Sequence, residues 1–245
     1  MFSQADDAGD ETMRASILLL LIASLVVAAP APKPAAKKIA DVFGTAVEAR
    51  GVTCEMSPRG ELRVGVAKEA AAEGEDHGAA RPLVTRKFEG DFQVTVRLAH
   101  VPSDAKDLSA VGDGKPAFSA GIALYTPADP TQSVTFLQQH LKEGETWKSD
   151  FFACIRYNTD VFESVRRPGE KLDRGPVYLR LTRRGGEFTS ASSHDGKKWT
   201  PVASLGRFKF GSAVLIGPAA THNTSAGHIV TFDEYVLTKP PEEKK

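Results

Sequence analysis

The sequence predicts an all-β fold in which two antiparallel sheets pack face to face as a sandwich. The dominant hydrophobic period is two, in short apolar and β-branched runs that end at Gly, Pro, Asp or Asn. No helical period extends beyond two turns, and many short strands joined by turns favour a sandwich over an α/β fold. The one helix candidate is Lys68–Glu73, an Ala/Glu-rich piece for which a mobile loop is the alternative.

The predicted strands are the segments in which apolar side chains alternate with polar ones. The clearest are Phe92–Val101, Phe118–Tyr125, Val134–His140, Phe151–Tyr157, Val177–Arg183, Glu187–Ser193, Ala213–Gly217 and His228–Leu237. Two weaker segments, Val52–Met56 and Glu61–Val66, form a predicted hairpin that turns at residues 57–60. The pair Gly185-Gly186 tolerates positive φ and predicts a further hairpin between its flanking strands.

The first residues resemble a secretory signal peptide. An apolar run, Ile17–Val27, follows Arg14 and precedes the small residues 28–31. We therefore expect residues 1–29 to be removed and the protein to be secreted, or to reside in the periplasm or cell envelope. Translation from Met13 and an uncleaved anchor are alternatives, although the run is about half the roughly 20 residues that a spanning helix needs.

The folded domain is expected over residues 39–238. Residues 30–38 combine prolines and lysines without a large apolar side chain, which is typical of a linker, and residues 239–245 have the same character and form a predicted disordered tail. The formal net charge is zero. Since no basic stripe with interleaved aromatic residues occurs, nucleic acid is not an expected partner.

The chain has two cysteines, Cys54 and Cys154. In an exported protein this pair can form a disulfide, which in the chain-entropy model would stabilise the fold by about 4–5 kcal/mol. Two unpaired cysteines buried in strands are the equally weighted alternative. Two cysteines without clustered histidines do not predict a structural zinc site.

Three parts of the chain resemble the concanavalin A-like lectin/glucanase superfamily. Phe88–Val94 resembles its opening strand, and Val177–Phe188 with Ser193–Trp199 resembles a hairpin of a bacterial branch related to the C-terminal module of β-xylosidases. Val230–Tyr235, after Gly217 and a Gly-containing loop, is similar to its closing strand. The resemblance implies a jelly-roll sandwich, and this superfamily contains binding modules as well as glycoside hydrolases.

Within the resembling hairpin, Leu179, Leu181 and Trp199 are expected to fill one face of the sandwich. Arg180 and Thr182 alternate with these leucines and are expected to remain in solvent. This pattern agrees with the implied fold and assigns no chemistry.

No catalytic residues are predicted. A jelly-roll glycosidase needs two carboxylates, about 5–5.5 Å apart for retention, and the Glu-x-Asp-x-x-Glu pattern of related endoglucanases does not occur. Glu143 and Glu145 flank Gly144 in an expected turn, and the acidic residues 73–76 lie in a Gly-rich loop, so both sets read as solvated charges. Residues 192–194, Ser-Ser-His, are adjacent on a hairpin end and form no predicted triad.

Metal binding is a minor alternative. His222 and His228 could converge with Asp233 on a metal, although their Gly/Ser/Thr-rich context favours a surface loop. Calcium through Asp195 or Asp233 is a further alternative in this fold. No cofactor is predicted.

A carbohydrate-binding site is the leading functional hypothesis. Sandwich domains bind sugars with aromatic platforms and planar hydrogen-bonding side chains on the concave sheet. The candidate residues are Tyr125, Gln138, His140, Trp147, Arg156 and Asn158. We therefore expect a non-catalytic exported domain that binds glycan. The alternatives are a glycoside hydrolase-like enzyme with a non-standard acid pair and an envelope structural or protein-interaction domain.

Overall fold

The computed structural model describes residues 38–47, 49–70, 80–100, 109–110, 115–158, 160–168, 175–206 and 208–242. All of them belong to one compact unit, Ala36–Lys245. The predicted signal peptide lies outside the described residues, as does the predicted linker except Lys38. Among the described residues, no helix is long and apolar enough to cross a membrane.

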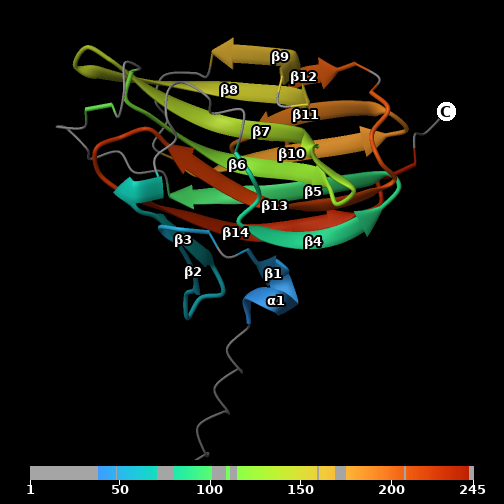
Figure 1. Ribbon diagram of the computed structural model, residues 1–245, viewed down its shortest axis with the longest axis horizontal. Helices are drawn as coiled ribbons and strands as arrows, with labels where there is room; N and C mark the ends of the chain where they lie inside the picture. The colour runs from blue at the N-terminus through green and yellow to red at the C-terminus, as the bar shows by residue number, and fades with distance from the viewer. Residues whose placement is uncertain are drawn as a thin grey trace, which may run out of the picture. The chain divides into compact units, whose positions relative to one another are not determined.

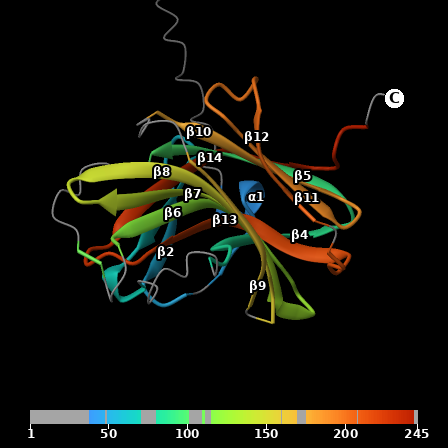
Figure 2. The same cartoon turned by 90° about the horizontal axis from the view of Figure 1, so that it is seen from above.

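Two antiparallel sheets of seven strands each form a sandwich (Figure 1), and Figure 2 shows them as separate layers. Sheet I contains, in spatial order, β1 (Thr45–Ala46), β4 (Val84–Glu89), β13 (Ala213–His222), β6 (Ala117–Thr126), β7 (Asp129–Glu143), β8 (Thr146–Tyr157) and β9 (Asp160–Pro168). Sheet II contains β12 (Thr200–Leu205), β11 (Glu187–Ser193), β10 (Val177–Arg184), β5 (Phe92–His100), β14 (His228–Thr238), β3 (Leu62–Val66) and β2 (Val52–Met56). The described helices are α1 (Ile39–Val42) and a 3₁₀ turn, Lys68–Ala70.

The all-β prediction is confirmed, and each predicted strand is present, although β7 begins at Asp129 rather than Val134 and β13 ends at His222 rather than Gly217. The predicted hairpin of β2 and β3 forms, and Gly60 in its turn has a φ of +83°. Strands β1, β4 and β9 were not predicted. β9 is an edge strand whose residues are mostly exposed and partly charged, so it lacks the buried alternation on which strand prediction depends.

The hydrophobic core lies between the sheets. Alternate side chains of each central strand point inward, and many are completely buried. Sheet I contributes Ile122, Leu124, Val134, Phe136, Ile155 and Ile216, and sheet II contributes Val94, Val96, Leu98, Leu179, Leu181, Phe188 and Phe232. Each of these side chains stabilises the fold by about 1.5–3 kcal/mol through burial.

The prediction for the β10–β12 region is correct for the leucines and wrong for the tryptophan. Leu179 and Leu181 are fully buried in the core. The Trp199 ring instead stacks against Arg180, whose guanidinium carbon lies 3.5 Å from the ring centroid. Since Arg180 alternates with the inward-facing leucines, Trp199 covers the outer face of sheet II.

The two cysteines are free thiols, as in the second of the alternatives for this pair. Cys54 lies on β2 of sheet II, where it packs against the core and its thiol contacts the Leu83 carbonyl oxygen at 4.0 Å. Cys154 lies on β8 of sheet I between the core residues Ala153 and Ile155, so it faces away from sheet II. A disulfide is therefore not formed, because the two side chains do not face each other.

Candidate functional site

The outer face of sheet I is defined by alternation along its central strands. On β7, Val134 and Phe136 point into the core, so Thr135, Leu137 and Gln139 point to the opposite face. The register places Gln139 opposite Ser119 of β6 and Asp150 of β8. It also places Thr135 opposite Ala123 and Cys154, so the rows of Thr135 and Gln139 cross the sheet on either side of Leu137.

Three polar side chains on this outer face are buried without a hydrogen-bond partner. Gln139 is 0% exposed, and neither its amide nitrogen nor its amide oxygen has a partner. The hydroxyl groups of Ser119, 1% exposed, and Thr135, 0% exposed, also lack partners. A buried polar group without a partner costs about 1–3 kcal/mol, so such groups in a native fold call for an explanation.

Apolar side chains complete the surface between these polar groups. Leu137, Ala123 and Ala219 form a small buried cluster with Ala80, from the segment that precedes β4. On β8, the half-buried Phe152 stands opposite Leu137, and the Arg166 guanidinium carbon lies 5.7 Å from its ring centroid. The outer face of sheet I thus combines an aromatic ring with unpartnered hydroxyl and amide groups.

Two of the predicted binding residues lie on this face. Tyr125 on β6 and Arg156 on β8 both stand opposite Ser133 of β7, at one end of the rows. Asn158 lies beyond the end of β8 in a turn, with a φ of +51°. Asn158 therefore does not share a strand face with Arg156, contrary to the sequence prediction from alternation.

Gln138 and His140 do not lie on the outer face, which corrects the sequence prediction. They share a face with Phe136, as predicted, but that face points into the sandwich. Gln138 donates from its amide nitrogen to the Ser149 hydroxyl at 3.1 Å. His140 packs on Phe118, with ring centroids 5.1 Å apart, and burial lowers the pKa of His140 to about 4.

Trp147 also belongs to the interior end of the sandwich rather than to a sugar platform. Its ring centroid lies 4.9 Å from that of Phe118. The Phe118 ring also packs against His228 of sheet II, with ring centroids 5.7 Å apart. His228 packs edge-on against His222, with ring centroids 4.9 Å apart. Burial is the main cause that lowers the pKa of His228 to about 3.

The minor alternative, in which His222, His228 and Asp233 converge on a metal, gains no support, and the favoured surface-loop interpretation is wrong for His222, which is 0% exposed. His222 and His228 face the interior, whereas Asp233 binds Arg97 with a 2.7 Å contact. Within the described part of the chain, no group of three or more His, Cys, Asp or Glu residues could hold a metal ion. Asp195 accepts backbone N–H groups of the following turn at 2.8 Å, which lowers its pKa to about 2.

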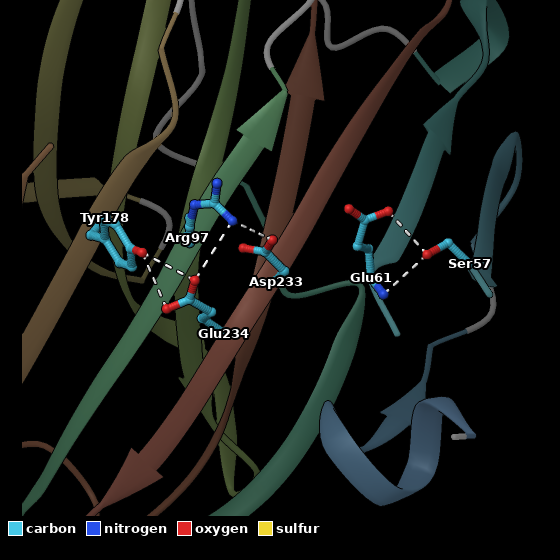
Figure 3. Close-up of polar contacts among 6 residues, drawn as sticks. All are labelled: Ser57, Glu61, Arg97, Tyr178, Asp233 and Glu234. Carbon is cyan, nitrogen blue, oxygen red and sulfur yellow. Dashed lines mark hydrogen bonds and ion pairs between the residues drawn. The ribbon is translucent and has the colours of Figure 1, made fainter. Parts of the chain in front are cut away.

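A charged cluster does lie on sheet II (Figure 3). Arg97 of β5 contacts Asp233 at 2.7 Å and Glu234 at 3.6 Å, and the Tyr178 hydroxyl donates to both Glu234 carboxylate oxygens at 3.0 and 3.2 Å. Burial raises the pKa of Asp233, although Arg97 opposes the shift. Beside it in the same view, the Ser57 hydroxyl donates to Glu61 and fastens the β2–β3 turn.

A bulge in β14 explains why two consecutive carboxylates reach one arginine. The pairing of β14 with β5 shifts between Asp233 and Val236, and Glu234 has a φ of +48°. Successive residues of a regular strand point to opposite faces, whereas a bulge can re-aim one of them. Asp233 and Glu234 therefore join Arg97 and Tyr178 in a link across β10, β5 and β14.

Of the remaining acidic candidates, the structure describes Glu143 and Glu145, whereas residues 73–76 lie outside the described residues. Glu143 forms ion pairs with Lys115 and Lys148, which lower its pKa. Glu145 is exposed in the turn after β7. The Ser193 hydroxyl contacts the Asp195 carboxylate at 3.0 Å, so it serves the turn after β11.

No protein-family model matches the chain, and no curated protein matches it. Solved structures do. A functionally unknown protein from Saccharomyces cerevisiae is 18% identical, with a TM-score of 0.58, over 80% of this chain and 95% of that chain. The GH43 BlXynB protein from Bacillus licheniformis is 15% identical, with a TM-score of 0.54, over 76% of this chain.

The match to the Bacillus licheniformis protein spans 34% of that longer chain. The carbohydrate-binding module CBM66 from Bacillus subtilis is 11% identical, with a TM-score of 0.43, which is too low to support an argument. Likeness at these identities shows the fold alone. The two antiparallel sheets and these matches show the fold, a sandwich of two antiparallel β-sheets.

Proposed function

We propose that this domain binds carbohydrate on the outer face of sheet I. The observation that carries the proposal is the completely buried amide of Gln139, which has no hydrogen-bond partner at either end. The unpartnered hydroxyls of Ser119 and Thr135 lie on the same face. A ligand rich in hydroxyl groups both donates and accepts hydrogen bonds, and it would satisfy all three side chains once the face around them, where they are at most 1% exposed, opens to admit it.

The aromatic residues of this face supply the second element of sugar recognition. Phe152 and Tyr125 are half-buried and offer ring surface on which an apolar sugar face can stack. They replace Trp147, whose ring is packed on Phe118. Binding sites for small molecules combine such apolar surface with a few placed polar groups.

The proposal includes a non-catalytic role and a secreted or cell-envelope location. Along the described rows around Gln139, the one carboxylate is Asp150, whereas glycoside hydrolysis ordinarily uses two. Asp233 and Glu234 do lie close together, but both form ion pairs with Arg97. A glycoside hydrolase-like enzyme therefore gains no support from these carboxylates.

The test is a glycan-array screen of the purified protein and two variants, Gln139→Leu and Phe152→Ala. Arg63→Gln is the matched control, because Arg63 is exposed on β3 of sheet II. We expect the wild type and the control to bind the same glycans, with the signal lost in Gln139→Leu and Phe152→Ala. Circular dichroism establishes that each variant is folded.

The same screen includes a chelator. Asp195 and Asp233 are engaged with turn N–H groups and Arg97 respectively, so we expect glycan binding to be independent of calcium. Absence of binding across plant, algal and bacterial glycans would contradict the carbohydrate proposal. It would favour the structural or protein-interaction role instead.

A further inference from the structure

A second surface, distinct from the outer face of sheet I, is a groove of about 510 Å³ on sheet II. Its lining includes side chains of β10 and β11 and the strand β12. Strand β9, at the edge of sheet I, lies beside β12 (Figure 1) and contributes Arg167. The volume falls within the range of small-molecule sites in proteins.

The lining of this groove is basic. Among the residues that the structure describes, Arg167, Arg180 and Arg184 line it, and no Asp or Glu does. The other polar side chains are neutral, namely Gln93, Thr182, Thr189, Ser190 and Ser204. The nearby carboxylate of Glu187 accepts a hydrogen bond from the Ser204 hydroxyl at 2.9 Å. Such a set of donors is complementary to an anion.

Arg180 is held in place by ring stacking, which leaves its hydrogen-bond donors available. Its guanidinium carbon lies 3.5 Å from the centroid of the Trp199 ring. Stacking uses the face of the guanidinium, whereas all five N–H groups lie in its plane. The Nε atom of Arg180 is buried without a hydrogen-bond partner.

Arg167 leaves donors available as well. One of its terminal nitrogens donates to the Pro201 carbonyl oxygen, which fixes the side chain against β12. Among the described residues, neither Arg167 nor Arg180 forms an ion pair with a carboxylate. The guanidinium groups of Arg167 and Arg180 are therefore held in place at one groove, and no carboxylate among the described residues neutralises their charge.

From this arrangement we infer that the groove binds an oxyanion, a carboxylate, sulfate or phosphate group of a small ligand. Guanidinium groups match the planar oxygens of carboxylates and the oxygens of phosphate and sulfate bidentately. The inference does not depend on carbohydrate binding by sheet I, because Arg167 is the one described residue of sheet I that lines the groove and it is not among the residues of the proposed carbohydrate site. Trp199 reports on occupancy, because its ring contacts Arg180 directly.

The experiment follows Trp199 fluorescence in a Trp147→Phe background, which leaves Trp199 as the one tryptophan of the chain. Sodium sulfate, sodium phosphate and sodium glucuronate are titrated separately at constant ionic strength, with sodium chloride and glucose as controls. Arg167→Gln and Arg180→Gln are compared with Arg63→Gln, which removes an exposed charge elsewhere on sheet II. Calorimetry on the wild-type protein repeats the titrations without any change at Trp147.

We expect a saturable signal with at least one oxyanion, and the anion that binds most tightly identifies the ligand group. Dissociation constants should rise about tenfold or more in Arg167→Gln and Arg180→Gln, because each loses charge-assisted hydrogen bonds, and remain unchanged in Arg63→Gln. The inference is overturned by the absence of saturation at millimolar concentrations, by an equal response to chloride, or by binding that Arg167→Gln and Arg180→Gln leave intact.

Discussion

Gln139 shows at the residue scale how function can oppose stability. Its amide is buried without partners in the free protein. Leucine has a similar shape and needs no hydrogen bond. We therefore expect Gln139→Leu to leave the free energy of unfolding unchanged or to raise it by about 1 kcal/mol, while glycan binding is lost. Urea unfolding of both proteins measures the change, and clear destabilisation by the leucine would show that the amide has a structural partner.

The sequence correctly predicted the strand that contains Gln139, but it assigned the binding role to the adjacent Gln138. The run Val134–His140 contains apolar residues at both alternations, since Phe136 and Leu137 are each buried. Alternation alone then leaves open which face of the strand meets the other sheet. The sequence therefore predicts Gln138 as the binding residue, whereas the structure places Gln139 on the outer face. Only the packing of Phe136 against the core settles the direction.

Buried histidines at the interior end of the sandwich predict acid sensitivity. Burial lowers the pKa of His140 from 6.5 to about 4 and that of His228 to about 3. The unfolded chain therefore takes up protons below pH 6.5 that the folded chain resists. Their contribution to stability is complete above pH 6.5 and declines as the pH falls through the folded pKa values.

The measurement is the free energy of unfolding in urea from neutral pH down to about pH 4. His140→Phe should reduce the decline, because phenylalanine fits the aromatic contact with Phe118 and cannot take up a proton. A pH dependence that is identical in His140→Phe and the wild type would contradict this account.

At the scale of elements, the turn between β11 and β12 tests the role of one glycine. Gly196 has a φ of +69°, and an added Cβ would lie 3.2 Å from the Tyr178 ring. Gly185 has a φ of +60° and open space at the same position, so it isolates the backbone effect. We expect Gly185→Ala to lower the free energy of unfolding by about 1 kcal/mol and Gly196→Ala to lower it further.

Thermal and urea unfolding of the two variants provide the comparison. Equal destabilisation would mean that Tyr178 moves aside at no cost, and the packing of this turn against sheet II would then be loose. The Gly185-Gly186 turn was recognisable in the sequence. The contact with Tyr178 was not, because it joins residues of β10 and the turn through the tertiary fold.

Elements with one buried face were predictable, and others were not. β10 alternates regularly between buried and partly exposed residues, so its pattern identifies it. The edge strand β9 and the short β1 lack such a pattern and were missed. The bulge in β14 was also unpredictable, since Asp233 and Glu234 fit a regular strand until Arg97 and the shifted register are known.

At the scale of the whole molecule, the sandwich is held by its core without a covalent link between the sheets. Cys54 and Cys154 lie on different sheets as free thiols. We expect the purified protein to show two reactive thiols after denaturation, with Cys154 unreactive while the protein is folded because it is 1% exposed. Thiol titration with and without denaturant measures this, and the absence of free thiols after denaturation would indicate a disulfide.

The arrangement of two faces gives the molecule its functional organisation. The outer face of sheet I contains buried, unpartnered neutral groups, whereas the groove on sheet II is lined by Arg180 and Arg184 together with Arg167 from the edge of sheet I. The fold class followed from hydrophobic period and turn residues, which are properties of the chain. The sites did not, because they depend on which strands become neighbours and on which alternation each strand buries.

The most direct test of the carbohydrate proposal is the NMR signal of the Gln139 side-chain amide during titration with a glycan that the array identifies. We predict a saturable shift of this signal, with the backbone amides of Ser119 and Thr135 shifting at the same midpoint. Binding accompanied by shifts confined to sheet II, with Gln139 unaffected, would contradict the assignment of the site to the outer face of sheet I.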